Sequence, residues 1–282
     1  MPKSRRLEFC SIISAKSGRC GENCRFCSQS IHYSGNSPVH GLLDDEAILD
    51  AARKAEEHGS VFFGLVTSGT TVSDAELETL CRVIGRIRES HKIAPCASLG
   101  WMDGSRCRQL MEAGLVRYHH NLETSERFYP QICTTHPWWR RVETVVAAKS
   151  AGLDVCSGGL FGLGETWKDR EDLAETLREL GIMSVPLNFL DPRPGTPLGD
   201  RSPLSAEEAI EIVSLFRSRL PAATLRLCGG RKRILGNRDA DAVRAGARGI
   251  MTGNYLTTSG YDAVRDRKMV RGLGMDVVET WK

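Results

Sequence analysis

Eight apolar runs of strand length, separated by helical patterns, constrain the fold of this 282-residue chain more than any other feature. The runs are Glu8–Ile13, Val61–Thr67, Ala94–Leu99, Val116–Leu122, Asp154–Phe161, Ser184–Leu190, Thr224–Cys228 and Gly249–Tyr255. Helical patterns lie at Asp44–Glu57, Asp74–Ser90, from near Pro137, at Lys168–Leu180, at 205–219 and near Ala240–Ala245. Alternating strands and helices are typical of a parallel sheet. Eight such units predict a TIM-type (βα)8 barrel, one domain over residues 1–282, with its active site at the C-terminal strand ends.

Charge and cysteine content narrow the functional class. The chain has 38 basic and 35 acidic residues, so no basic surface indicates a nucleic-acid partner. No stretch of eighteen apolar residues occurs, which predicts no membrane span and no export. Ten cysteines without a secretory context indicate ligands and buried thiols in a reducing cytoplasm.

Three cysteines lie close together in one loop, residues 20–27, directly after the first predicted strand. Cys20, Cys24 and Cys27 are separated by three and then two residues. Thiolates are soft ligands that select iron–sulfur clusters, zinc or copper(I). A triad without a nearby fourth thiol favours a four-iron cluster with one iron left open for a substrate or cofactor. The alternatives are a zinc loop with a distant fourth ligand and three unrelated buried thiols.

Four further cysteines fall on alternate predicted strands: Cys10, Cys96, Cys156 and Cys228 lie on strands one, three, five and seven. Alternate strands of a barrel contribute side chains to the same interior layer. These thiols are therefore predicted to meet inside the barrel and hold a second metal centre. The alternative is that they pack as small apolar side chains. The remaining cysteines, Cys81, Cys107 and Cys133, receive no role.

Polar residues at strand ends are further site candidates. His119, Asn121 and Glu123 share one strand face and would point the same way. Asn188 lies within an apolar run and needs hydrogen-bond partners if it is buried. Arg226 precedes Cys228 by two residues, so it would share the inward face and require an anion or a sulfide. Water-exposed strand ends are the alternative reading.

The C-x3-C-x2-C spacing with Phe26 before the last cysteine resembles the radical S-adenosylmethionine (SAM) enzymes. The resemblance implies that Cys20, Cys24 and Cys27 hold a 4Fe–4S cluster and that Phe26 lies beside the adenine. It also implies that the open iron chelates SAM, which an electron from the cluster cleaves to a 5′-deoxyadenosyl radical.

Six further stretches resemble the biotin synthase branch of these enzymes. They begin at Cys10 (CSIISAKSG), Cys27 (CSQS), Asn121 (NLETS), Cys156 (CSGGLFGLGET), Ser184 (SVPLNFL) and Pro194 (PGTPL). The resemblance implies radical insertion of sulfur between C6 and C9 of dethiobiotin, with an auxiliary iron–sulfur cluster as the sulfur source. It further implies a homodimeric barrel and a reduced ferredoxin or flavodoxin as electron donor.

The resemblance also assigns residues to SAM and to the substrate. Asn121 and Glu123 match the pair near the SAM ribose, and Glu123 stands where the family commonly has aspartate. Arg141 matches the arginine that pairs with the methionine carboxylate. Gly162 belongs to the glycines that let the backbone approach the nucleoside. Asn121 and Asn188 match the residues that hold the ureido ring, whose polar groups suit amide side chains.

The sequence departs from the family's usual auxiliary site. That site has cysteines on strands two, three and five and an arginine on strand seven. The matching residues here are Gly64, Cys96, Cys156 and Arg226, so the second-strand cysteine is missing. Cys10 and Cys228 are additional thiols. Four thiolates favour a four-iron auxiliary cluster over a 2Fe–2S cluster, with Arg226 near a sulfide.

The sequence leaves two other functions open. Related small radical SAM enzymes, of the hydrogenase-maturation or methylornithine type, share the barrel and triad but have no need for four barrel thiols. A non-catalytic carrier with two clusters would have no use for Arg141, Asn121 and Asn188.

Overall fold

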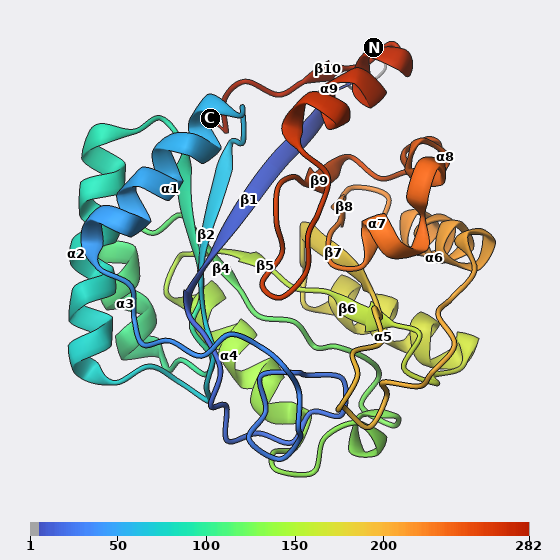
Figure 1. Cartoon of the computed structure of the whole chain (residues 1–282), viewed down its shortest axis with the longest axis horizontal. Helices are drawn as coiled ribbons and strands as arrows, with labels where there is room; N and C mark the ends of the chain where they lie inside the picture. Colours follow the sequence, from blue (N-terminus) through green and yellow to red (C-terminus); the bar gives the residue numbers. More distant parts are fainter. Residues whose placement is uncertain (1–5, 282) are drawn as a thin grey trace.

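The computed structural model describes residues 6–281, and these residues form a closed parallel barrel with helices around it (Figure 1). Its strands are β1 (Arg6–Lys16), β2 (Phe62–Thr67), β3 (Ala94–Ser98), β4 (Arg117–His119), β5 (Asp154–Cys156) with β6 (Gly159–Phe161), β7 (Ser184–Phe189), β8 (Thr224–Leu227) and β9 (Gly249–Met251). Pairing of β9 with β1 closes the barrel, because Glu8 lies in register with Gly249. The predicted (βα)8 fold is confirmed.

The helices follow the strands in the order a barrel requires. They are α1 (Asp45–Glu57), α2 (Asp74–Ser90), α3 (Gly104–Glu112), α4 (Trp139–Ser150), α5 (Trp167–Glu179), α6 (Ala206–Arg219), α7 (Arg231–Ile234), α8 (Asp239–Ala245) and α9 (Ala263–Gly272), with 3-10 turns η1 (Tyr129–Gln131) and η2 (Gly236–Arg238). Side-chain caps begin six of them, at Asp44, Ser73, Asp103, Thr166, Ser205 and Asp262. Each cap accepts a hydrogen bond from a first-turn N–H that would otherwise lack a partner. A short strand, β10 (Asp276–Val277), pairs with the start of β1.

The structure corrects several predicted boundaries. The fifth predicted strand is two short strands, because the strand is interrupted around Gly158. Only a glycine fits at this position, since a Cβ would lie 2.0 Å from the carbonyl oxygen of Pro186. The eighth ends at Met251, and residues 252–262 form a loop instead. The first extends to Lys16, since Ser11 and Ser14 interrupt its apolar pattern without ending it. Helices α3, α7 and α9 and strand β10 were not predicted.

The candidate site lies among the long loops that follow the C-terminal ends of the strands. The loop after β1 and the loop after β4 lie together at the lower end of the barrel in Figure 1. Asn23 joins them, because its side chain accepts from the N–H of Thr134 at 2.9 Å.

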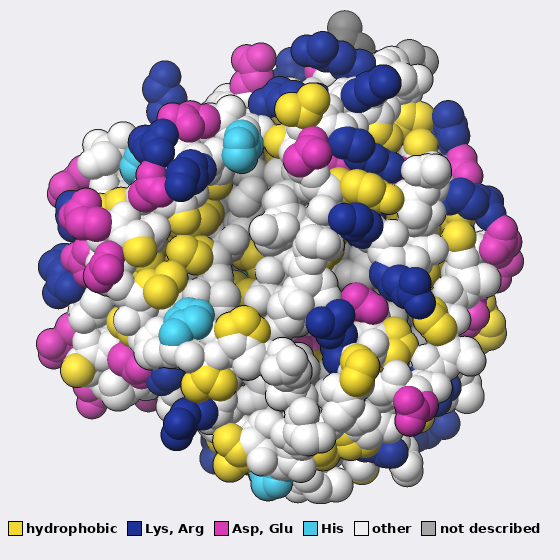
Figure 2. All heavy atoms as spheres, viewed as in Figure 1, with side chains coloured by type: hydrophobic (Ala, Val, Ile, Leu, Met, Phe, Trp, Pro, Cys, Tyr) yellow, Lys and Arg dark blue, Asp and Glu magenta, His cyan; other side chains and the backbone are white. Residues whose placement is uncertain are grey.

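None of the helices within residues 6–281 has the length and apolar character that a membrane span requires. On the face in Figure 2, Lys and Arg side chains are interspersed with Asp and Glu, as the nearly balanced charge predicts.

Candidate active site

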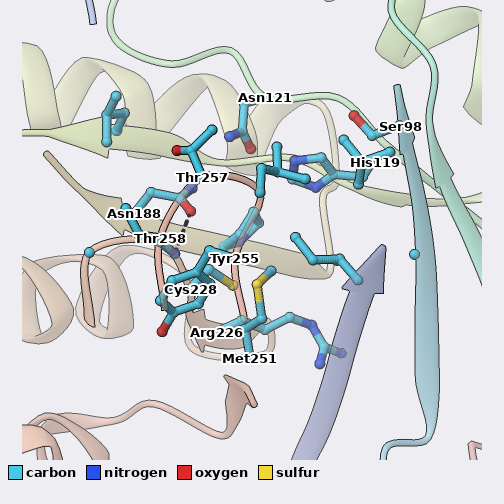
Figure 3. A pocket seen from close by; sticks show the side chains of 18 of the residues that line it. Ser98, His119, Asn121, Asn188, Arg226, Cys228, Met251, Tyr255, Thr257 and Thr258 are labelled. Carbon is cyan, nitrogen blue, oxygen red and sulfur yellow. Dashed lines mark hydrogen bonds between the residues drawn. The ribbon is translucent and has the colours of Figure 1, made fainter. Parts of the chain in front are cut away.

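A cavity of about 400 Å³ inside the barrel reaches the loop at its C-terminal end. Figure 3 shows Asn121, Asn188, Arg226 and Cys228 around this space, together with His119 and the loop after β9. Among the residues that line it are the four barrel cysteines, Cys10, Cys96, Cys156 and Cys228. Phe26 and Cys27 of the loop after β1 line it as well. The cavity therefore joins the four barrel cysteines to Cys27 of the loop triad, whereas Cys20 and Cys24 do not line it.

The three loop cysteines differ in their surroundings: Cys24 is buried, whereas Cys20 and Cys27 are half-buried. Cys24 packs in an apolar cluster with Tyr129 and Leu163, and Phe26 and Cys27 lie against the same cluster. Burial raises the pKa of the Cys27 thiol to about 11. Within residues 6–281, the sulfur atoms of Cys20, Cys24 and Cys27 do not all lie within 4.8 Å of one another, as the ligand atoms of a single ion would. A wider spacing suits a cluster in which each thiolate binds a different iron.

Two of the barrel thiols form a hydrogen-bonded pair. The hydrogen bond with Cys228, aided by the charges of Arg226 and Arg117, lowers the pKa of Cys10 to about 7. The same bond, together with burial, raises the pKa of Cys228 well above its usual value. Cys10 is therefore the more readily ionised thiol of the pair.

The other two barrel thiols have contrasting environments. Burial raises the pKa of Cys96 to about 12, so a metal would be needed to hold it as a thiolate. Burial is the largest effect on Cys156 and acts to raise its pKa, but the hydrogen bond from His119 and the charges of His119, Arg117 and Arg226 together lower that pKa overall. As with the triad, no three barrel thiols in the described chain share the spacing of one ion's ligands. This arrangement fits a polynuclear cluster better than a single ion.

Arg226 lies inside the barrel and is 2% exposed. Its Nε–H donates to Ser184 Oγ at 2.8 Å, and Nη2 forms an ion pair with Glu8. Its Nη1 is buried and has no hydrogen-bond partner in the described part of the chain. Because an unpaired buried guanidinium nitrogen is costly, an acceptor such as a cluster sulfide fits this position.

A second arginine, Arg117 on β4, also lines the cavity. Its guanidinium lies 3.8 Å from the centre of the Phe62 ring, and that of Arg226 lies 5.2 Å from the same centre. An ion pair with Asp154, at 2.6 Å, holds it. Sequence reasoning missed Arg117, although it precedes His119 by two residues and so shares its inward face. Two cations thus flank the four thiols.

Residues predicted to bind SAM and substrate lie above the thiols. Arg141 Nη1 donates to the carbonyl oxygen of Asn121 at 3.0 Å and lies 3.5 Å from Glu123 Oε1. Glu123 has a positive φ of 71°, which is unusual for a residue with a side chain. Asn121, Glu123 and Asn188 line the cavity. Gly162 does not line it, and its N–H donates to Glu165 Oε1 at 3.0 Å.

Asn188 is already engaged with the backbone. Its Nδ2 donates to the carbonyl oxygen of Gly159 at 3.1 Å, and its Oδ1 accepts from the N–H of Gly229 at 2.9 Å. An amide carries two N–H groups and two lone pairs, so one donor and one acceptor remain. The side chain is therefore oriented rigidly with capacity for a ligand.

Comparison with known proteins agrees with this geometry. Residues 15–177 match the Radical SAM superfamily, and residues 186–276 match the Biotin and Thiamin Synthesis associated domain. The chain is 49% identical to biotin synthase of Geobacter metallireducens over 272 residues, covering 96% of this chain and 83% of the relative. It is 47% identical to biotin synthase of Heliobacterium modesticaldum, with the same coverage.

Solved structures support the fold. Methylornithine synthase has a TM-score of 0.82 at 19% identity, covering 97% of this chain and 84% of that one. The FeFe-hydrogenase maturase from Carboxydothermus hydrogenoformans also has a TM-score of 0.82 at 19% identity, with 97% and 68% covered. The sequence relatives and the family matches together show that the chain belongs to the biotin synthase family of the radical SAM superfamily.

Proposed function

We propose that this chain inserts sulfur between C6 and C9 of dethiobiotin to give biotin. The observation that carries the proposal is the single cavity, which joins Cys27 and Phe26 of the radical-site loop to four thiols inside the barrel. When bound, the radical-site cluster with SAM supplies a radical that abstracts hydrogen, and the auxiliary cluster supplies the sulfur.

In this proposal the loop residues hold the radical-forming cofactors. Cys20, Cys24 and Cys27 ligate the 4Fe–4S cluster, and Phe26 packs beside the adenine. Arg141 is largely buried and already lies between Asn121 and Glu123, so its charge is placed for a carboxylate. Gly162 takes a supporting role, because its φ of 92° forms the turn that leads to Leu163 of the apolar cluster.

The substrate is placed between the radical site and the barrel thiols. Asn188 and Asn121 offer amide groups for the ureido ring. The fixed orientation of Asn188 favours this role, because binding loses less side-chain entropy at a pre-ordered group.

Cys10, Cys96, Cys156 and Cys228 are the proposed auxiliary ligands. Their spacing, too wide for one ion, supports an iron–sulfur cluster, and the departure from the family's usual ligand set favours the four-iron form over 2Fe–2S. Arg226 offers its unpaired Nη1 to a sulfide, and with Arg117 it offsets the negative charge of the site. Thiolates in an apolar interior require such compensation.

Further assignments complete the proposal. The family resemblance implies that a reduced ferredoxin or flavodoxin would supply the electrons. It also implies that the active form would be a homodimer. The ten free cysteines support a reducing cytoplasm as its location. We also propose that the chain acts as one domain, since both family matches fall within one barrel.

The deciding experiment is an anaerobic incubation of the reconstituted protein with reductant, SAM and dethiobiotin. We expect both 5′-deoxyadenosine and biotin, detected by mass spectrometry. Formation of 5′-deoxyadenosine without biotin would retain the radical chemistry and contradict the substrate. The relatives of the methylornithine and maturase type would then be the better guide to the reaction. Absence of both products together with absence of SAM binding would favour an electron carrier.

A further inference from the structure

Arg193 lies in the loop between β7 and α6 and lines the cavity. It follows Asn188 along the chain, beyond the C-terminal end of β7, so it stands at the open end of the barrel. Its side chain is 39% exposed, which places the guanidinium between the cavity and solvent. The sequence offered no signal for this position, because a lone arginine in a loop has no characteristic spacing.

The backbone that carries Arg193 is held firmly. A proline on either side of it restricts the chain. Its carbonyl oxygen accepts from the Thr196 hydroxyl at 2.8 Å and from the Thr196 N–H at 3.2 Å. At Gly195, where φ is 83°, a Cβ would lie 2.6 Å from the carbonyl oxygen of Ser34, so this loop packs closely against the loop after β1. The direction of the Arg193 side chain into the cavity is therefore set by the fold.

The guanidinium of Arg193 has capacity for an anion. Its Nη1 lies 3.8 Å from Asp191 Oδ2, which is too far for a hydrogen bond. Within residues 6–281 two further arginines line the cavity, Arg117 and Arg226, and each is held beside the barrel thiols by a carboxylate. Arg193 is thus the lining arginine that stands away from the thiols and lacks a close partner.

The shape of the proposed substrate matches this position. Dethiobiotin has a ureido ring at one end and a carboxylate at the other, joined by an alkyl chain. With the ring at Asn188, the alkyl chain can pack against Leu190 and Leu256, which line the same cavity. Because an unpaired carboxylate is costly to bury, this end of the molecule points toward the open end of the barrel. There it meets Arg193.

We propose that Arg193 binds the carboxylate of dethiobiotin and makes the cavity select the acid over uncharged analogues. The inference rests on the proposed function, because it takes dethiobiotin as the ligand. A guanidinium can bind a carboxylate through two parallel N–H···O hydrogen bonds. Asp191 also lines the cavity, and its charge opposes that of a ligand carboxylate, so the preference for the acid is moderate.

The test is equilibrium binding of dethiobiotin and of its primary amide to the anaerobically reconstituted protein with SAM. The unaltered protein should bind the acid about tenfold more tightly than the amide, which corresponds to about 1.4 kcal/mol. Arg193→Gln should abolish this preference by weakening the acid alone, and Arg193→Lys, which keeps the charge, should retain part of it. Because Arg193 is half-buried, added salt should reduce the preference. Arg219→Gln, at an exposed ion pair with Glu171 on α6, is the matched control and should keep the full preference.

Three outcomes would overturn the inference: equal affinity of the unaltered protein for acid and amide, an undiminished preference in Arg193→Gln, and equal weakening of both ligands in that variant. The last would show that the substitution distorts the loop without removing a specific charge contact. SAM binding, measured in the same samples, checks that each variant is folded. Failure of the unaltered protein to bind either ligand while it binds SAM would contradict the proposed function, and this inference with it.

Discussion

Arg226 and Glu8 form an ion pair across the barrel wall, over a residue that has no side chain. Both lie in register with Gly249, Glu8 from β1 and Arg226 from β8. A Cβ at Gly249 would lie 2.8 Å from Arg226 Cγ and 2.9 Å from its Nη1. The glycine therefore makes the space through which the guanidinium reaches Glu8 and presents Nη1 inside the barrel.

Gly249→Ala should displace Arg226 and weaken the auxiliary site. We expect loss of auxiliary iron and of biotin formation, because the guanidinium moves away from the thiols. Triad iron and cleavage of SAM should persist. Iron and sulfide analysis with Mössbauer spectra would measure this. Gly272→Ala at the end of α9 is the matched control, since a Cβ there meets no atom within 4 Å. Full auxiliary iron in the Gly249 variant would show that the Arg226 position is unimportant.

Asn188→Ala should weaken dethiobiotin binding far more than SAM binding. Removal of a hydrogen bond to a buried polar ligand group costs about 1–3 kcal/mol, or roughly a fivefold to 150-fold rise in Kd. Equilibrium binding of each ligand to the reconstituted protein would measure the two constants. The variant also loses bonds to Gly159 and Gly229, so thermal unfolding must be compared in parallel. Equal weakening of both ligands would contradict the placement.

Asp169 should make stability depend on acid pH. Burial alone would raise the pKa of its carboxyl, but hydrogen bonds from Ser125 and Thr166 and the charge of Arg127 lower it below the ordinary 3.8. Because the folded pKa is the lower one, this stability is present above about pH 4 and is lost as pH falls through the folded value. Asp169→Asn should lower the free energy of unfolding at pH 7 by roughly 1–3 kcal/mol and flatten its fall below pH 4.

Urea unfolding at several pH values would measure both effects. Asp172→Asn, on the exposed side of the same helix, is the control. A parallel loss in both variants at every pH would show that the carboxylate of Asp169 contributes no specific pH dependence.

The barrel could be predicted from sequence because strand-length runs and helical patterns are local signals. The inward placement of Cys10 and Cys96 followed from counting strands, and Arg117 could have been found by the same alternation along β4. The proximity of Cys133 to Cys24 could not be predicted from the sequence, because it depends on how two loops more than a hundred residues apart fold over one end of the barrel. The space over Gly249 likewise depends on the register of three strands.

On β2 this chain has a glycine at the position where the family's usual auxiliary site has a cysteine. Gly64 on β2 lies in register with both Ile12 and Cys96, and a Cβ at Gly64 would lie 3.1 Å from Ile12 Cγ2. Ile12 therefore occupies the space beside the position where the family's second-strand cysteine would project. The missing ligand must come from elsewhere, and the hydrogen-bonded pair of Cys10 and Cys228 lines the same cavity.

Cys10→Ser and Cys228→Ser should each lose auxiliary iron and biotin formation, since a serine hydroxyl is a poor ligand for iron–sulfur clusters. Uncoupled cleavage of SAM should partly survive, because the radical-site cysteines are intact. Cys81→Ser is the control, and it should retain both activities. Gly64→Cys added to Cys10→Ser should fail to restore auxiliary iron, because Ile12 crowds the new side chain. Full biotin formation by the Cys10→Ser, Cys228→Ser double variant would show that these two thiols only pack in the core, with Cys96, Cys156 and Arg226 left as the ligand set.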